Sequence, residues 1–148
     1  MDGYKKVKGR KRTVAVDALG LVLKCHVCAA NVADVKAAPL VLFWIAEQYQ
    51  RLVKVLADQA YRGDLETDLD EVYDVSLEVV EHQGKGFQVQ QLRWIVERTW
   101  AWLENARALN RDYERLPENH EGMIYVAMIR LMLRRLGKNC RFWRNKSV

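Results

Sequence analysis

The chain of 148 residues is 50% hydrophobic and 29% charged, which is the balance of one globular domain with a single core. No run of about 18 or more apolar residues occurs, which excludes a membrane-spanning helix, and the basic N-terminus lacks the apolar stretch of a signal peptide. Three cysteines, an odd number, predict no disulfide framework and favour the reducing cytoplasm as the location.

The net charge of +5 is distributed unevenly. Basic residues gather near the N-terminus and again from Arg130 onward, and the segment from Asp64 to Asp74 is acidic. Two basic ends are what a nucleic-acid backbone attracts through neutralisation of its phosphates. A solubilising tail at each terminus explains the same charges, so both interpretations stay open on charge alone. The first basic run consists of Lys5, Lys6, Lys8, Arg10, Lys11 and Arg12.

Apolar patterning predicts elements in the order β-β-α-β-α-β-α-α. "RTVAVDALGLVLKCHVCAA" is typical of a hairpin that turns at "DALG". A helix follows with Asn31 as its N-cap, and Pro39 either ends its first turn or begins its main part. "LVKVLAD" predicts a buried parallel strand ending at Asp58. The remaining elements are an acidic helix "DLETDLDEVY", a strand "VSLEVVEH", a glycine loop "GKGF", a helix over 91 to about 110, and another over about 118 to 136. This order predicts one mixed sheet covered by helices.

Two carboxylates occupy positions that admit a functional role. Asp58 ends its strand, where functional residues gather in open α/β sheets. Glu97 lies off the helix stripe formed by Ile95, Thr99, Trp102, Ala106 and Leu109. The alternatives are a turn residue for Asp58 and an i–4 ion pair with Arg93 for Glu97. Two such carboxylates at a sheet edge could instead bind Mg²⁺, together with substrate phosphates.

Several segments follow one another in a familiar order: "DGYKKVKGRKRTVAVDALGLVL", "CAANVAD", "ADQAYRG", "KGFQV", "RWIVERTWAWL" and "RDYERLPENHEGMIYVAMIRLMLRRL". From Asp2 to about Leu136, the chain resembles the C-terminal part of a bacterial insertion-sequence transposase of the DDE type, in the insertion-sequence-five-like group. The resemblance implies a ribonuclease-H-like α/β fold, a mixed sheet with flanking helices. It also implies an Asp-Asp-Glu set that holds two divalent metals, Mg²⁺ or Mn²⁺, for cutting DNA and joining the freed 3′-OH to a target.

The resemblance assigns the second Asp to Asp58 in "ADQAYRG" and the Glu to Glu97 in "RWIVERTWAWL". Ala60 stands where a glycine is common, and "QQLRW" replaces a segment that usually carries a proline. Neither departure removes a carboxylate. Catalysis and metal binding are therefore expected from Asp58 and Glu97.

The first Asp of the family lies on a strand upstream of "DGYKK", so residues 1–148 are expected to form a catalytic domain truncated at its N-terminus. Asp17 is rejected as a substitute because its strand runs antiparallel to the missing one, and Asp2 lies in an unanchored terminal loop. The missing strand would sit between the hairpin and the Asp58 strand. An upstream transposase fragment could restore the pairing, or the hairpin could slide against the Asp58 strand. The isolated chain is expected not to transpose.

The resemblance makes DNA the expected partner, with a homo-oligomer also possible. The alternative is a non-catalytic remnant that binds DNA or dimerises. Trp94, Trp100 and Trp102 either stack on a base or, as we favour, pack in the core. A basic tail is expected from about residue 137. The expected DNA contacts are Lys5, Lys6, Lys8, Arg10, Lys11, Arg12, Arg93 and Arg98.

Three further features are predicted to be structural. "CHVC" resembles half of a zinc site, but no second ligand pair with zinc spacing accompanies it. Cys25 and Cys28 are therefore predicted to be small core residues. His82 and His120 are assigned to loop or surface positions. Met and Leu at helical spacing in "MIYVAMIRLMLRRL" predict a core face.

Overall fold

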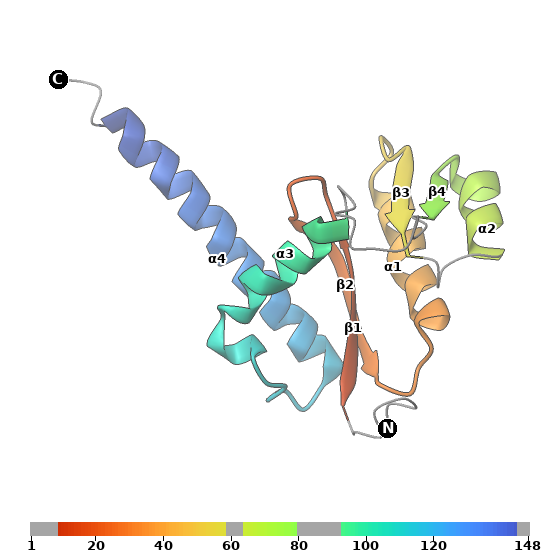
Figure 1. Cartoon of the computed structure of the whole chain (residues 1–148), viewed down its shortest axis with the longest axis horizontal. Helices are drawn as coiled ribbons and strands as arrows, with labels where there is room; N and C mark the ends of the chain where they lie inside the picture. The colour runs from red at the N-terminus through yellow and green to blue at the C-terminus, as the bar shows by residue number, and fades with distance from the viewer. Residues whose placement is uncertain (1–8, 59–63, 80–92, 145–148) are drawn as a thin grey trace, which may run out of the picture.

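The computed structural model describes residues 9–58, 64–79 and 93–144 (Figure 1). The order β-β-α-β-α-β-α-α is confirmed, with a 3-10 turn, η2, added before the last helix. The predicted glycine loop "GKGF" lies outside the described residues, as do Asp2, Ala60 and His82. The elements are β1 (Arg10–Val16), β2 (Val22–Ala29), α1 (Asp34–Gln48), β3 (Lys54–Ala57), α2 (Asp64–Tyr73), β4 (Ser76–Val79), α3 (Arg93–Glu104), η2 (Arg107–Leu109) and α4 (Pro117–Arg144).

The hairpin turns where the sequence predicts. β1 pairs with β2 in antiparallel register, Thr13 opposite His26. Oδ1 of Asp17 accepts hydrogen bonds from the backbone N–H groups of Leu19 at 2.9 Å and Leu21 at 2.8 Å. Gly20 adopts a φ of 81°, a conformation that glycine enters without a Cβ penalty. The carboxylate of Asp17 therefore stabilises the turn, as its place in "DALG" predicts.

The fold is α/β with both kinds of strand pairing, which is compatible with a ribonuclease-H-like domain. β3 and β4 pair in parallel, from Lys54 opposite Ser76 to Ala57 opposite Val79. The expected single mixed sheet is nevertheless split in two, because β1–β2 and β3–β4 form separate two-stranded sheets among the described strands. The hairpin has not slid against β3. β1 and β3 run in opposite directions (Figure 1).

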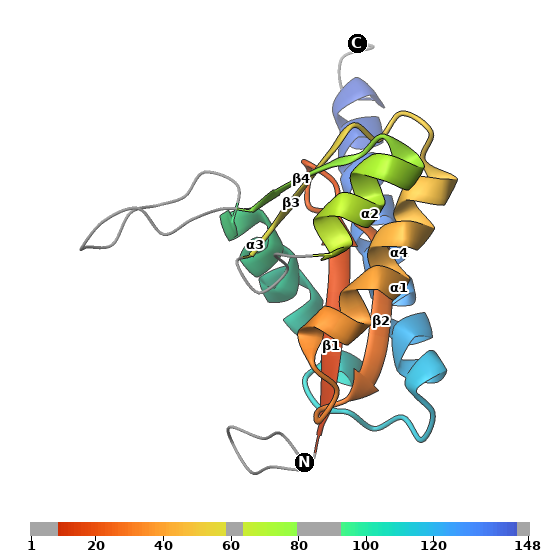
Figure 2. The same ribbon diagram turned by 90° about the vertical axis from the view of Figure 1, so that its right-hand side faces the viewer.

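Two apolar clusters hold the layers together. The hairpin lies between α1 and α4, as both views show (Figures 1 and 2). One cluster joins α1 to α2 and β4, with Leu69 at 0% exposure. The other joins β2 to α3, η2 and α4, with Ile124 at 0%. The hairpin contributes side chains to both clusters. Hydrophobic burial is the dominant favourable contribution to folding, so the hairpin links the two halves of the core.

The helix boundaries differ from the sequence prediction in three places. α1 starts at Asp34 with Ala33 as its N-cap in place of Asn31, and it contains Pro39 within its length. α3 ends at Glu104, and η2 takes up the rest of the predicted helix. α4 continues to Arg144 beyond its expected end near 136, because Gly137 costs a helix only about 1 kcal/mol relative to alanine. The predicted basic tail from about 137 is thus helical as far as Arg144.

Only the first half of α4 packs against the rest of the domain. Ile124 and Met128 are buried, whereas Met132, Leu133 and Leu136 are exposed. The predicted core face of this helix therefore holds only for its first turns, because the helix projects past the hairpin (Figure 1). Within the described parts of the chain, no helix, including α4, has the length and apolarity needed to cross a membrane.

Cys25 is the centre of the contact between β2 and α4. Its side chain is 0% exposed, and its backbone N–H donates to the Tyr125 hydroxyl at 3.1 Å. Burial raises the pKa of the Cys25 thiol to about 11 and also raises the pKa of Tyr125 to about 12. Cys28, three residues on, is only half-buried. The predicted core role is confirmed for Cys25 and holds in part for Cys28.

The two thiols should differ in reactivity. At pH 8 we expect iodoacetamide to modify Cys25 at least about tenfold more slowly than Cys28, since the thiolate is the nucleophile and a buried thiol is screened from reagent. Peptide mapping by mass spectrometry over a time course measures each site separately. Equal rates at the two positions would show that the hairpin does not stay packed on α4 in solution.

Candidate metal and DNA-binding site

Asp58 directly follows β3, at the C-terminal end of the parallel pair. Asp58 is exposed, whereas Val55 and Ala57 just before it pack against the α1–α2 cluster. The strand is thus anchored through its apolar side chains, and the first residue beyond the ladder emerges into solvent. The rest of "ADQAYRG", from 59 to 63, lies outside the described residues.

Glu97 is exposed on α3 because the opposite face of the helix is buried. Ile95 and Thr99 are buried as the sequence stripe predicts, and Leu103 at 2% exposure is a core position that the stripe missed. A different periodic choice, i, i+4, i+8 from Ile95, would have found it. The same stripe predicted that Glu97 points away from this face, which the structure confirms.

The hairpin turn sets the orientation of α3. The hydroxyl of Thr99 lies 2.8 Å from the Gly20 carbonyl oxygen and 2.9 Å from that of Ile95. One guanidinium nitrogen of Arg98 donates to the Leu19 carbonyl at 3.1 Å. A Cβ at Gly20 would lie 2.7 Å from the Thr99 hydroxyl oxygen. The helix can approach this closely only because residue 20 is glycine, a contact that no local sequence pattern reveals.

The elements that carry the two carboxylates approach each other. In both views the C-terminal end of β3 lies near the first turn of α3 (Figures 1 and 2). Across residues 9–58, 64–79 and 93–144, no three His, Cys, Asp or Glu side chains are grouped as a metal would require. Within the described part of the chain, Asp58 and Glu97 therefore belong to no group of three such side chains.

Some of the expected DNA contacts are engaged within the protein. Arg10 forms an ion pair with Asp112 at 3.0 Å and donates to the carbonyl oxygens of Glu114 at 2.9 Å and Arg115 at 2.7 Å. Its guanidinium thus ties the start of β1 to the connection before α4. Lys11 lies 3.4 Å from an oxygen of Asp34.

Two other expected contacts stack on tryptophan rings. The guanidinium of Arg12 lies 4.8 Å from the Trp100 ring centre. That of Arg98 lies between Trp94 and Trp102, at 4.1 Å and 4.7 Å. Such pairs combine cation–π attraction with burial of the aromatic face. All three tryptophans are partly exposed, so the predicted core packing is incomplete.

The remaining expected contacts have no described side chain. Lys5, Lys6 and Lys8 lie outside the described residues. Arg93 begins α3, but its side chain is likewise outside the description. Their assignment to DNA stays a prediction.

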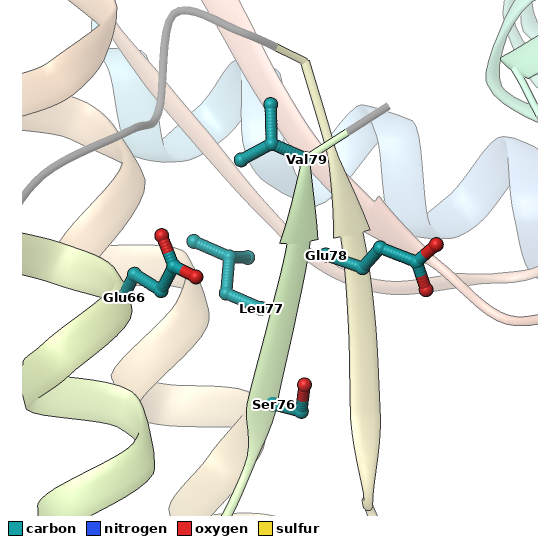
Figure 3. A pocket seen from close by; sticks show the side chains of 5 residues that line it. All are labelled: Glu66, Ser76, Leu77, Glu78 and Val79. Atoms are coloured by element: carbon teal, nitrogen blue, oxygen red, sulfur yellow. The ribbon is translucent and has the colours of Figure 1, made fainter. Parts of the chain in front are cut away.

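The surface hollow beside β4 lies away from these residues. It encloses about 480 Å³ and is lined by Glu66, Ser76, Leu77, Glu78 and Val79. Glu66 and Leu77 lie on one side of β4, while Glu78 extends to the other (Figure 3). Glu78 is held there by Lys54 at 2.7 Å. Neither Asp58 nor Glu97 lines this hollow, so it is not the candidate site.

The assignment of His120 to a loop or surface position was wrong. His120 is 3% exposed near the start of α4. Its Nδ1 lies 3.1 Å from Oδ1 of Asp112, the carboxylate that also pairs with Arg10. The sequence pattern around His120 carries no signal of this burial, although Asp112 lies only eight residues earlier in the chain.

Comparison with known proteins agrees with the order of segments in the sequence. Residues 1–132 match the family "Transposase DDE domain". A curated protein of Burkholderia cepacia, "Putative transposase for insertion sequence element IS402", is 33% identical over 122 residues, which cover 76% of this chain and 57% of that protein. The chain thus spans little more than half the length of this relative. No solved structure matches the present chain significantly. The chain belongs to the insertion-sequence transposases with a DDE domain.

Proposed function

We propose that this chain is part of the catalytic domain of a transposase that cuts and joins DNA strands in the cytoplasm by phosphoryl transfer. Asp58 and Glu97 serve as two of its metal-binding carboxylates. The observation that supports this is their placement in a chain of this family. Both residues are exposed, and the C-terminal end of β3 lies near the first turn of α3 (Figures 1 and 2).

The chemistry of the two side chains fits a hard divalent ion. Carboxylate oxygens are preferred ligands of Mg²⁺ and Mn²⁺, and Mg²⁺ is commonly held by one or two carboxylates together with substrate phosphates. When bound, such ions stabilise charge on the attacking and leaving oxygens of an in-line displacement. Asp58 and Glu97 hold the ions, and the anchor between Thr99 and Gly20 keeps Glu97 on the outer face of α3.

A third acidic ligand is implied by the family resemblance, and we propose that a further strand brings it. β1 and β3 each have one ladder partner among the described strands, which leaves one edge of each open. Because β1 and β3 run in opposite directions (Figure 1), a strand between them would be antiparallel to β1 and parallel to β3. An upstream transposase segment or a second chain would supply this strand.

The DNA substrate is proposed to contact the basic residues near the start of β1 and on α3. Phosphate contacts of this kind position a protein on DNA without reading sequence. The arginines stacked on tryptophan remain suitable, because a stacked guanidinium keeps its N–H donors in the plane of the group. These contacts comprise Lys5, Lys6, Lys8, Arg10, Lys11, Arg12, Arg93 and Arg98.

A second candidate function, DNA binding and dimerisation without catalysis, is favoured by an exposed apolar stripe along α4. Val126, Ile129, Leu133 and Leu136 are between 54% and 62% exposed. Their spacing of three and four residues is that of a coiled-coil seam. A second copy of the chain could cover this stripe, and sedimentation of the chain beside its Leu133→Glu variant would measure that association.

A strand-transfer assay separates the two functions. We expect the isolated chain, with Mg²⁺ or Mn²⁺ and duplexes carrying the ends of its element, to bind DNA in a salt-dependent manner but to form no joined product. Adding the upstream segment should restore joining if the first proposal is right. Robust joining by the isolated chain would overturn the need for a further strand. Binding without joining, even with that segment present, would favour the second function.

A further inference from the structure

A small cavity of about 90 Å³ lies where the start of β1 meets the connection between η2 and α4. Its charged and polar lining includes Arg10 and Arg12 from β1, Arg111 and Asp112 from the connection, and His120 from α4. Three arginines and one acidic residue therefore line the cavity. Asp58 and Glu97 do not line it, so the cavity is separate from the candidate metal site.

The carboxylate of Asp112 is already neutralised inside this cluster. It pairs with Arg10 at 3.0 Å and lies 3.1 Å from Nδ1 of His120. A carboxylate can only accept hydrogen bonds, so Nδ1 carries a proton. With Asp112 and Arg10 offset against each other, Arg12 and Arg111 leave the cavity with an excess of positive charge.

His120 supplies a second indication that the cavity is built for a ligand. Its side chain is 4% exposed, and its Nε2 is buried without a hydrogen-bond partner among the residues that the structure describes. Buried polar atoms in native proteins are nearly always paired, and each exception calls for an explanation. An unpaired buried ring nitrogen, in a residue that lines an arginine-rich cavity, is explained by a ligand that bonds to it.

We propose that this cavity binds one phosphate group of the DNA backbone. Planar guanidinium groups match the geometry of phosphate oxygens, and Arg12 from β1 and Arg111 from the connection both line the cavity. The choice of DNA as the source rests on the proposed function, whereas the phosphate chemistry rests on the cavity itself. A phosphate held here would fix the register of the duplex against the start of β1.

The proposal assigns a protonation state to the bound form. A phosphodiester offers only acceptors, so Nε2 must donate and His120 must be an imidazolium when the phosphate is bound. The charged groups that face it are Arg10 and Arg12 from β1 and Arg111 and Asp112 from the connection. Glu121, its neighbour on α4, is engaged with His26 at 3.3 Å.

The first test replaces an exposed arginine of the cavity, Arg111. Arg111→Gln should weaken binding of a mixed-sequence duplex by roughly eightfold near 0.1 M salt and lower the slope of log K against log salt by about 1. Arg107→Gln is the matched control, because Arg107 is also exposed and lies four residues earlier, at the start of η2, but does not line the cavity. Equal effects of the two variants would overturn the cavity as a DNA contact.

The second test observes His120 directly, without a substitution that could unfold the domain. In phosphate-free buffer, the nitrogen resonance of its Nε2 is followed while inorganic phosphate or the same duplex is added. A change in this resonance with both probes supports the proposal. A response to inorganic phosphate alone retains the phosphate site but overturns DNA as its source. No response to either overturns the site. Because neither titration needs a divalent metal, failure of catalysis at Asp58 and Glu97 would leave both results unchanged.

Discussion

Replacing Glu97 by glutamine, or Asp58 by asparagine, is expected to weaken Mn²⁺ binding to the chain by at least about tenfold, or ~1.4 kcal/mol. Each change removes one anionic oxygen ligand while keeping the shape of the side chain. Both residues are exposed, so folding should be unaffected. Electron paramagnetic resonance of free Mn²⁺ in a titration measures the affinity, and circular dichroism checks the fold.

Glu104→Gln is the matched control for these variants. Glu104 is an exposed glutamate on the same helix, at its last residue. A general effect of net charge would weaken Mn²⁺ binding equally in Glu97→Gln and Glu104→Gln. The proposed metal site fails if the two variants bind Mn²⁺ alike, or if the double variant of Asp58 and Glu97 binds as tightly as the parent chain.

Gly20→Ala is expected to lower the free energy of unfolding by about 2–4 kcal/mol. The φ of 81° at this residue strains any L side chain. The added Cβ would also lie 2.7 Å from the Thr99 hydroxyl oxygen and 3.0 Å from the Trp102 ring. Relief requires α3 to move away and the contact between Thr99 and the Gly20 carbonyl to break. Equilibrium denaturation in urea measures the change.

Gly122→Ala provides the comparison, since a Cβ at Gly122 meets nothing within 4 Å. Gly122 lies inside α4, where alanine is favoured over glycine by about 1 kcal/mol. This variant should therefore be as stable as the parent chain or more so. If Gly20→Ala proves equally well tolerated, the close packing of α3 on the hairpin turn is not present in solution, and the orientation of Glu97 loses its support.

The local elements were predictable because their causes are local. The turn at "DALG" depends on Asp17 and Gly20, whose hydrogen bonds and backbone angle span only a few residues. The acidic helix was predicted over the same residues that it occupies, Asp64–Tyr73. Helix ends were less predictable. Nothing near Leu136 stops α4, because a single glycine is too weak a breaker.

Sequence by itself determined the order of elements, the membership in the transposase family, and the positions of Asp58 after a strand and Glu97 on an exposed helix face. Tertiary structure alone decided what surrounds them. The split into two sheets and the engagement of Arg10 with Asp112, 102 residues apart, both depend on contacts across the chain. No local pattern encodes such contacts, because an arginine on a strand edge looks the same in sequence whether it meets solvent, DNA or a distant carboxylate.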